Sequence, residues 1–294
     1  MRVKSIWNLL RETFAEWQAD KVPLWAAALA YYTAFSLAPL LVIAIAIASA
    51  VFGEEAARGE VVGQIQGLVG EPGAEAIQAM LQNTQKPGSG GVVATVVGIG
   101  ALLLGASGVF GQLQEALNAI WGVEPKPGRG IRFFLQNRFV SFAMVLVIGF
   151  LLLVSLLLSA GLAAFSTFLG HLFPNFAIAG QLLNFLISFG VMVLLFGLIY
   201  KVLPDVKVPW KYLWTGAIVT ALLFNIGKFL IGLYLGSGSV SSTYSAAASL
   251  GIILLWVFYS AQILLFGAEF TKVYAKKYGM HRIKPVKDAI FSDQ

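Results

Sequence analysis

The feature that most constrains this chain is a long stretch without a charged side chain. From Phe139 to Tyr200 there is no Lys, Arg, Asp or Glu. A soluble fold cannot accommodate such a stretch, because its core segments need a polar shell. A helix of about 20 apolar residues crosses a hydrocarbon core of about 30 Å. The stretch is therefore long enough for two spans, and the sequence predicts an integral membrane protein.

The composition of the whole chain agrees with this prediction. Apolar residues make up 58% of the chain and charged residues 12%, against about 45–50% and 25% in soluble domains. The absence of cysteine excludes disulfides, thiolate zinc sites and cysteine nucleophiles. No nucleotide-binding or hydrolase motif occurs either. We expect no metal, no cofactor and no catalytic residue, and hence no enzyme.

Uncharged runs predict an all-α fold, a polytopic membrane protein with six transmembrane helices. The predicted spans are 24–52, 92–110, 139–167, 177–200, 213–235 and 246–268. Pro23 fits the first turn of the first helix, and the turn at 170–175 divides the long uncharged stretch. Together the spans form one domain, 23–275, and a basic tail follows at 276–294.

An N-terminal segment, 1–22, precedes the spans. Its apolar residues recur at helical spacing and include Trp7 and Trp17, while basic and acidic residues occupy the other face. This pattern predicts an amphipathic helix lying in the membrane interface. The alternative is a helix docked on the protein's own cytoplasmic loops.

The connection 53–91 is long and acidic. Apolar residues at helical intervals, interrupted by Gly70–Gly73, predict a helical hairpin outside the cytoplasm. It would either cap an outward opening or rest on the membrane surface.

Basic residues are distributed unequally between the two sets of connections. One set carries 17 Lys and Arg residues and the other carries two, Arg58 and Lys86. The positive-inside rule therefore places both termini in the cytoplasm. The net charge of +6 follows from this topology, and we expect no nucleic-acid partner.

Polar residues within the spans are candidates for a substrate pathway. Lys228 is the only charged residue well inside a span, with Asn225 one turn earlier. Intramembrane charges usually mark function, although a side chain near a helix end can instead reach the interface.

A second group of polar residues lies in the cytoplasmic half of the first span and at the cytoplasmic ends of the second and sixth helices. The first span contributes the hydroxyl groups of Tyr31, Tyr32 and Ser36. Two polar stripes at helical spacing contribute the others, which are Glu115 with Asn118 and Gln262 with Glu269. We predict that they line a polar cavity between the first, second and sixth helices. Glu115 and Glu269 could meet basic residues such as Arg138 or Lys272 in a cytoplasmic gate. The alternatives are an aromatic belt at the interface and ordinary surface ion pairs.

Five segments of the chain resemble the YihY/virulence-factor BrkB family. They are AAALAYYTAFSLAP (26–39), LQEALNAIWGV (113–123), LPDVKVPW (203–210), GKF (227–229) and AQILLFGAEF (261–270). The resemblance covers nearly the whole chain and implies a multi-pass protein of the bacterial cytoplasmic (inner) membrane. Family members were once mislabelled ribonuclease BN, and the roles proposed for them include transport or lipid export.

These observations favour a transporter or flippase-like protein that handles an amphiphilic or lipid-like solute. The expected partners are membrane lipids and that solute, with a homo-oligomer left open. The alternative is a structural or regulatory membrane partner that transports nothing. A ribonuclease would need clustered carboxylates for metal ions, whereas the cytoplasmic side offers only scattered ones.

The predicted topology can be tested by thiol labelling, since the chain has no cysteine of its own. Single cysteines replace Gln64 and Lys126. An impermeant thiol reagent applied to intact cells is expected to label position 64 and not position 126. The reverse pattern, or labelling of both positions, would contradict the orientation.

Overall fold

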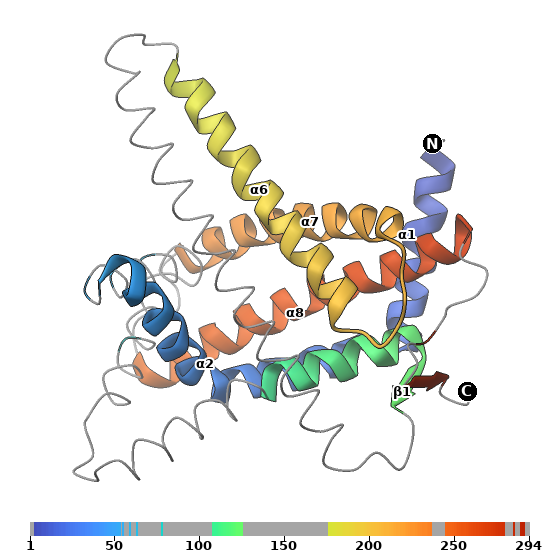
Figure 1. Ribbon diagram of the computed structural model, residues 1–294, viewed down its shortest axis with the longest axis horizontal. Helices are drawn as coiled ribbons and strands as arrows, with labels where there is room; N and C mark the ends of the chain where they lie inside the picture. The colour runs from blue at the N-terminus through green and yellow to red at the C-terminus, as the bar shows by residue number, and fades with distance from the viewer. Residues whose placement is uncertain are drawn as a thin grey trace.

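The described part of the protein consists mainly of helices, with two short strands (Figure 1). The computed structural model describes residues 3–53, 108–125, 176–236 and 245–279, together with 289–291 and the single positions 55, 59, 63, 78 and 285. The helices are α1 (Val3–Ala19), α2 (Val22–Phe52), a helix over 108–121, α6 (Phe176–Val202), α7 (Trp210–Gly236) and α8 (Ser245–Lys277). The strands are β1 (Val123–Pro125) and β2 (Ala289–Phe291).

Helix α8 lies at the centre of the described bundle. It packs against α1, α2 and α7, and α7 in turn packs against α6 (Figure 1). Three segments, Phe185–Val202, Trp210–Ile231 and Gly251–Lys277, are long and apolar enough to cross a membrane. They lie in α6, α7 and α8, where the sequence predicts the last three spans.

The remaining predicted spans are described to different extents. Helix α2 covers the whole first predicted span and has Pro23 in its first turn. The second span, apart from 108–110, and the third span lie outside the described residues, as does nearly all of the connection 53–91. The total of six spans therefore stays a prediction.

Helices α7 and α8 approach each other through two matching pairs of glycine and threonine. A Cβ atom at Gly216 would overlap the Thr271 side chain, and one at Gly267 would overlap Thr220. Each threonine donates its hydroxyl to the carbonyl one turn earlier in its own helix, Thr220 to Gly216 at 2.8 Å and Thr271 to Gly267 at 2.7 Å. The hydroxyl protons are thus satisfied within each helix, while the glycines let the two backbones meet.

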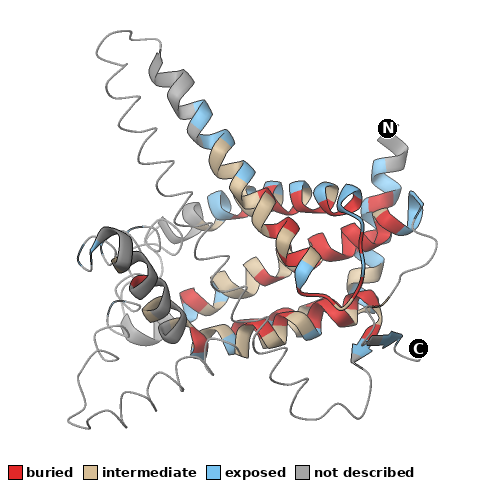
Figure 2. Cartoon of the chain, viewed as in Figure 1, coloured by how far each residue is buried: buried red, intermediate tan, exposed pale blue. Residues whose placement is uncertain are grey.

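The main core lies where α8 ends and α7 begins (Figure 2). Its fully buried side chains come from the helix over 108–121, α6, α7 and α8, and include Leu117, Ile120, Tyr200, Leu213 and Leu265. Tyr200 Oη donates to the Leu264 carbonyl at 2.6 Å and lies 2.9 Å from the Thr220 hydroxyl. These bonds satisfy the phenol within an apolar core.

A small antiparallel sheet corrects the purely α-helical prediction. Strand β1 pairs with β2 in the register Val123 with Phe291 and Pro125 with Ala289, and Val206 forms an isolated bridge with Pro285. Part of the predicted basic tail therefore pairs with segments far away in the chain. Strands of three residues are too short to show an alternating pattern in the sequence. Helix α8 also continues to Lys277, beyond the predicted end of the sixth span at residue 268.

The contact between α7 and α8 can be tested at Gly267. The Gly267→Ala variant is expected to lose about 1–3 kcal/mol of stability, because its methyl group would overlap Thr220. The matched control is Gly190→Ala in α6, where a Cβ meets nothing within 4 Å. This control should keep or slightly raise the melting temperature, since alanine favours a helix. Equal melting temperatures for the two variants would contradict the close contact.

Candidate functional site

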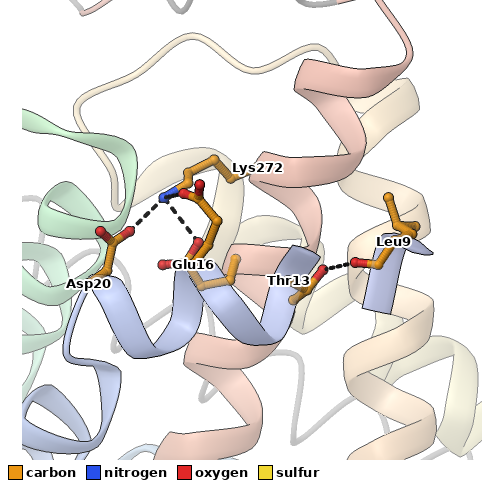
Figure 3. Close-up of polar contacts among 6 residues, drawn as sticks. Leu9, Thr13, Glu16, Asp20 and Lys272 are labelled. Atoms are coloured by element: carbon orange, nitrogen blue, oxygen red, sulfur yellow. Dashed lines mark hydrogen bonds and ion pairs between the residues drawn. The ribbon is translucent and has the colours of Figure 1, made fainter. Parts of the chain in front are cut away.

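The candidate site lies where α1 packs against the C-terminal part of α8. Leu9 forms a buried apolar cluster with Phe270 and Val273 of α8. Thr13, one turn along α1, is fully buried and donates its hydroxyl to the Leu9 carbonyl at 2.8 Å (Figure 3). This apolar contact places the next two turns of α1, which are acidic, beside α8.

Lys272 of α8 is surrounded by three carboxylates. Its Nζ lies 2.5 Å from Asp20 Oδ2 and 2.8 Å from Glu16 Oε2, both at the C-terminal end of α1 (Figure 3). The third partner is Glu269 Oε2, 3.0 Å away on α8 itself. We call Glu16, Asp20, Glu269 and Lys272 the charge cluster. A second ion pair, Lys277 with Glu12 at 3.6 Å, lies beside it.

The members of the charge cluster differ in exposure. The side chains of Lys272 and Glu269 are 5% and 0% exposed, whereas those of Glu16 and Asp20 are 38% and 20% exposed. The cluster therefore extends from a fully buried carboxylate to the surface. A buried charge needs a partner of opposite sign, because its desolvation costs several kcal/mol.

Glu269 is incompletely satisfied within this cluster. Neither of its carboxylate oxygens accepts a hydrogen bond, although Oε2 is ion-paired with Lys272. The nearest carboxylate oxygens of Glu16, Asp20 and Glu269 lie within 4.8 Å of one another. Lys272 Nζ lies within 3.0 Å of an oxygen from each of these carboxylates, so the group already holds a cation.

The turn between α1 and α2 holds Asp20 beside Lys272. Lys21, the next residue, has a φ of 52°, and it is the one residue other than glycine with positive φ in the described ranges. A left-handed conformation is unfavourable for a residue with a side chain. The ion pair of Asp20 and the start of α2 at Val22 together hold this turn.

A second polar contact joins the helix over 108–121 to the loop after α6. Asn118 donates Nδ2 to Asp205 Oδ2 at 2.9 Å and accepts the Asp205 backbone N–H through Oδ1 at 2.8 Å. Gln114 also reaches Asp205 Oδ2, at 3.4 Å. This paired arrangement fixes the loop that leads into α7.

The nine predicted pathway residues lie in different surroundings. Glu269 belongs to the charge cluster and Asn118 is paired with Asp205. Asn225 donates to the Ala221 carbonyl at 2.8 Å and to Met192 Sδ at 3.4 Å. Ser36 is buried, Gln262 is half-buried, and four residues are exposed: Tyr31, Tyr32, Glu115 and Lys228.

The predicted polar cavity depends partly on residues outside the described ranges. Within those ranges α2 and α8 are in direct apolar contact, through Ile45 and Ile253. Gly108 lies beside Ser36 and Tyr32, whose nearest side-chain atoms would be 3.7 Å from a Cβ at that position. The rest of the second predicted span, 92–107, is not described.

Sequence reasoning did not select Glu16, Asp20, Lys272 or Asp205 as site residues. The signal available was the spacing of Glu12, Glu16 and Asp20, which puts three acidic residues on one face of α1. Such a face is normally solvated, and nothing in α1 itself indicates a buried lysine as its partner.

The comparisons with known proteins cover almost the whole chain. Residues 13–290 match the family described as Virulence factor BrkB. The chain belongs to this family. The match agrees with the sequence segments identified above and, together with the apolar helices, shows an integral membrane protein.

Relatives in the BrkB family carry the name UPF0761 membrane protein. The relative from Psychromonas ingrahamii is 29% identical over 281 residues, covering 92% of this chain and 88% of the relative. The one from Pseudomonas aeruginosa is 30% identical over 266 residues, covering 85% of this chain. The chain spans only 58% of that Pseudomonas protein and 61% of the relative from Verminephrobacter eiseniae. No solved structure matches the chain.

The charge cluster makes a strong prediction for Lys272→Met. Removal of the ammonium leaves the buried Glu269 carboxylate without a counter-charge, which typically costs about 3–5 kcal/mol. We expect a lower melting temperature and faster proteolysis within α1. Lys276→Met is the matched control, because Lys276 is exposed in the last turn of the same helix. If the two variants melt and are cleaved alike, the cluster does not hold α1.

Proposed function

We propose that this BrkB-family protein is a transporter or flippase-like protein of the bacterial cytoplasmic membrane. Its solute is amphiphilic or lipid-like, and it needs no enzymatic step. The polar headgroup of the solute follows one face of α8, and the apolar part stays in the surrounding lipid.

The observation that carries this proposal is the position of the buried acceptors that receive no hydrogen bond, one of which, Glu269 Oε2, is ion-paired with Lys272. Within the described ranges these side-chain atoms are Gln262 Oε1, Glu269 Oε1 and Glu269 Oε2, all on α8. Residues seven apart share a helix face and are separated by about 10 Å along the axis. An unsatisfied buried acceptor costs about 1–3 kcal/mol. A headgroup with ammonium or hydroxyl donors would satisfy these atoms in succession.

The outer face of α1 supports a lipid partner. Ile6, Trp7, Leu10 and Phe14 are exposed, with Trp7 at 69% and Phe14 at 51%. The opposite side, with Leu9 and Thr13, is buried against α8. Large apolar side chains on the outside of a membrane protein are expected to contact lipid, so α1 is both docked on the protein and interfacial.

The proposed orientation places α1, the charge cluster and the C-terminal strand β2 on the cytoplasmic side. Its support is the excess of basic residues in the connections at that end. A headgroup would then enter from the cytoplasmic leaflet, beside the outer face of α1.

A second candidate function is a membrane partner that transports nothing. The close glycine–threonine contacts between α7 and α8 favour it, because they make that pair of helices rigid. In this case the acceptors of Gln262 and Glu269 would be satisfied by water, and a second copy of the chain could serve as the partner.

Lipid movement in proteoliposomes tests the proposal. The purified protein is reconstituted with fluorescent phosphatidylethanolamine or phosphatidylcholine, and dithionite measures how fast the label reaches the outer leaflet. We expect faster lipid movement with the wild type than in protein-free vesicles. Phosphatidylethanolamine should move faster than phosphatidylcholine when its label leaves the N–H donors of the ammonium intact. Gln262→Leu should slow the movement about tenfold, as expected for the loss of one hydrogen bond of about 1.4 kcal/mol.

The control variant is Gln78→Leu, at an exposed helical position. It should leave the rate unchanged. Wild-type rates equal to those of protein-free vesicles with either lipid would overturn the proposal and favour the partner without transport.

A further inference from the structure

The charge cluster contains more negative than positive charge. If every group is ionised, three carboxylates surround one ammonium, and the excess is two negative charges. Lys277, the next basic residue that points toward α1, is paired with Glu12 and supplies no compensation. Three other lysines lie at this end of the bundle. Lys21 precedes α2, Lys211 is in the first turn of α7, and Lys276 is in the last turn of α8. All three are exposed. The excess charge is therefore concentrated between α1 and α8.

Glu269 is the member of the cluster that is least able to carry a charge. Its side chain is fully buried, and neither oxygen accepts a hydrogen bond from the described residues. The ammonium of Lys272 donates to Asp20 and contacts Glu16 at shorter distances than it contacts Glu269. The Glu269 carboxylate thus has two carboxylate neighbours. Of the three carboxylates, it lies farthest from the ammonium of Lys272, the one cation of the charge cluster.

A proton fits this arrangement better than a metal ion. Lys272 Nζ already lies within 3.0 Å of an oxygen from each of the three carboxylates, so a metal would have to displace it. A proton needs no additional volume. It would convert Glu269 from an acceptor into an O–H donor. A carboxylate oxygen of Asp20 lies within 4.8 Å of one of Glu269 and could accept the bond after a small movement.

We propose that Glu269 and Asp20 share an exchangeable proton, which makes the contact between α1 and α8 a proton-binding site. The proton comes from water at the exposed edge formed by Glu16 and Asp20, binds to a Glu269 oxygen, and lowers the excess charge from two to one. Its release returns it to that edge. The site shares Glu269 with the proposed path of the headgroup, but it is testable without a transport assay.

Proton binding has a structural consequence for α1. With the proton bound, the Glu269 hydroxyl and the Lys272 ammonium both hold Asp20, and α1 stays docked. Without it, the carboxylate of Glu269 faces those of Asp20 and Glu16 with no hydrogen bond, and repulsion weakens the docking. Alkaline pH is therefore expected to loosen α1, and lower pH to restore its contact with α8.

Infrared spectroscopy of the full chain in lipid nanodiscs tests the proton site directly. At neutral pH the wild type should show the carbonyl band of a protonated carboxylic acid that shifts on exchange into heavy water. Glu269→Gln should remove this band. Glu124→Gln, at an exposed position in β1, should retain it. The spectra are recorded in sodium, calcium and choline salts.

A second variant and a distance measurement cover the case in which Glu269→Gln does not fold. Asp20→Asn removes one charge and offers Glu269 an amide donor, so this variant should lose the band as well. Spin labels on cysteines at Gln18 and Lys276, both exposed, should report a longer and broader distance at alkaline pH in the wild type. Glu269→Gln should remove that pH dependence.

Three results would overturn the proton site. The first is a wild type without the protonated-carboxyl band at neutral pH. The second is a folded Glu269→Gln variant that keeps the band. The third is loss of the band on addition of sodium or calcium, which would show that a metal cation occupies the site. A negative result in the lipid assay would leave these outcomes unchanged, so the two proposals fail separately.

Discussion

The buried ammonium of Lys272 is the constraint on which this end of the protein depends. A charge with 5% exposure is stable only when opposite charges accompany it, and two of its three carboxylates come from α1. Asp20 and Lys272 are 252 positions apart in the chain, yet their side chains form the shortest ion pair in the cluster. The position of α1, the turn at Lys21 and the start of α2 are therefore all tied to one side chain on α8.

The contact between α7 and α8 is close, as expected in a membrane. Lipid tails are as apolar as leucine, so helices in a bilayer gain little by hiding leucine from lipid and associate through tight packing instead. The pairs Gly216 with Thr271 and Gly267 with Thr220 meet this requirement. Their hydroxyls bond within their own helices, so close approach leaves no hydroxyl proton unsatisfied. Helix α8 is thus held by close packing along α7 and by charge at its C-terminal part.

The sequence was informative wherever a single segment carries the signal. Uncharged runs located α6, α7 and α8, because a span must be apolar along its whole length. The polar stripes pointed to Asn118 and Glu269. Both are buried, Asn118 is hydrogen-bonded to Asp205, and Glu269 is ion-paired with Lys272. The sequence could not show that Glu16 and Asp20 reach Lys272, since an acidic helix face is normally solvated and the partner is distant in the chain. The pairing of β1 with β2 was unpredictable for the same reason, and each strand has only three residues.

Helix α1 combines an exposed apolar surface with the carboxylates of the charge cluster. One side of the helix carries the exposed aromatic side chains of Trp7 and Phe14. Phe14 stacks on the half-buried Trp17, with ring centroids 5.3 Å apart. The other side ends in the carboxylates that hold Lys272. Because a helix of 17 residues is a rigid body over this length, a change in the charge of the cluster cannot be confined to one side. Under the proposed proton site, a displacement that separates Asp20 from Lys272 would also move the aromatic side chains of α1. A solute that enters beside α1 would therefore meet a different surface in each charge state of the cluster.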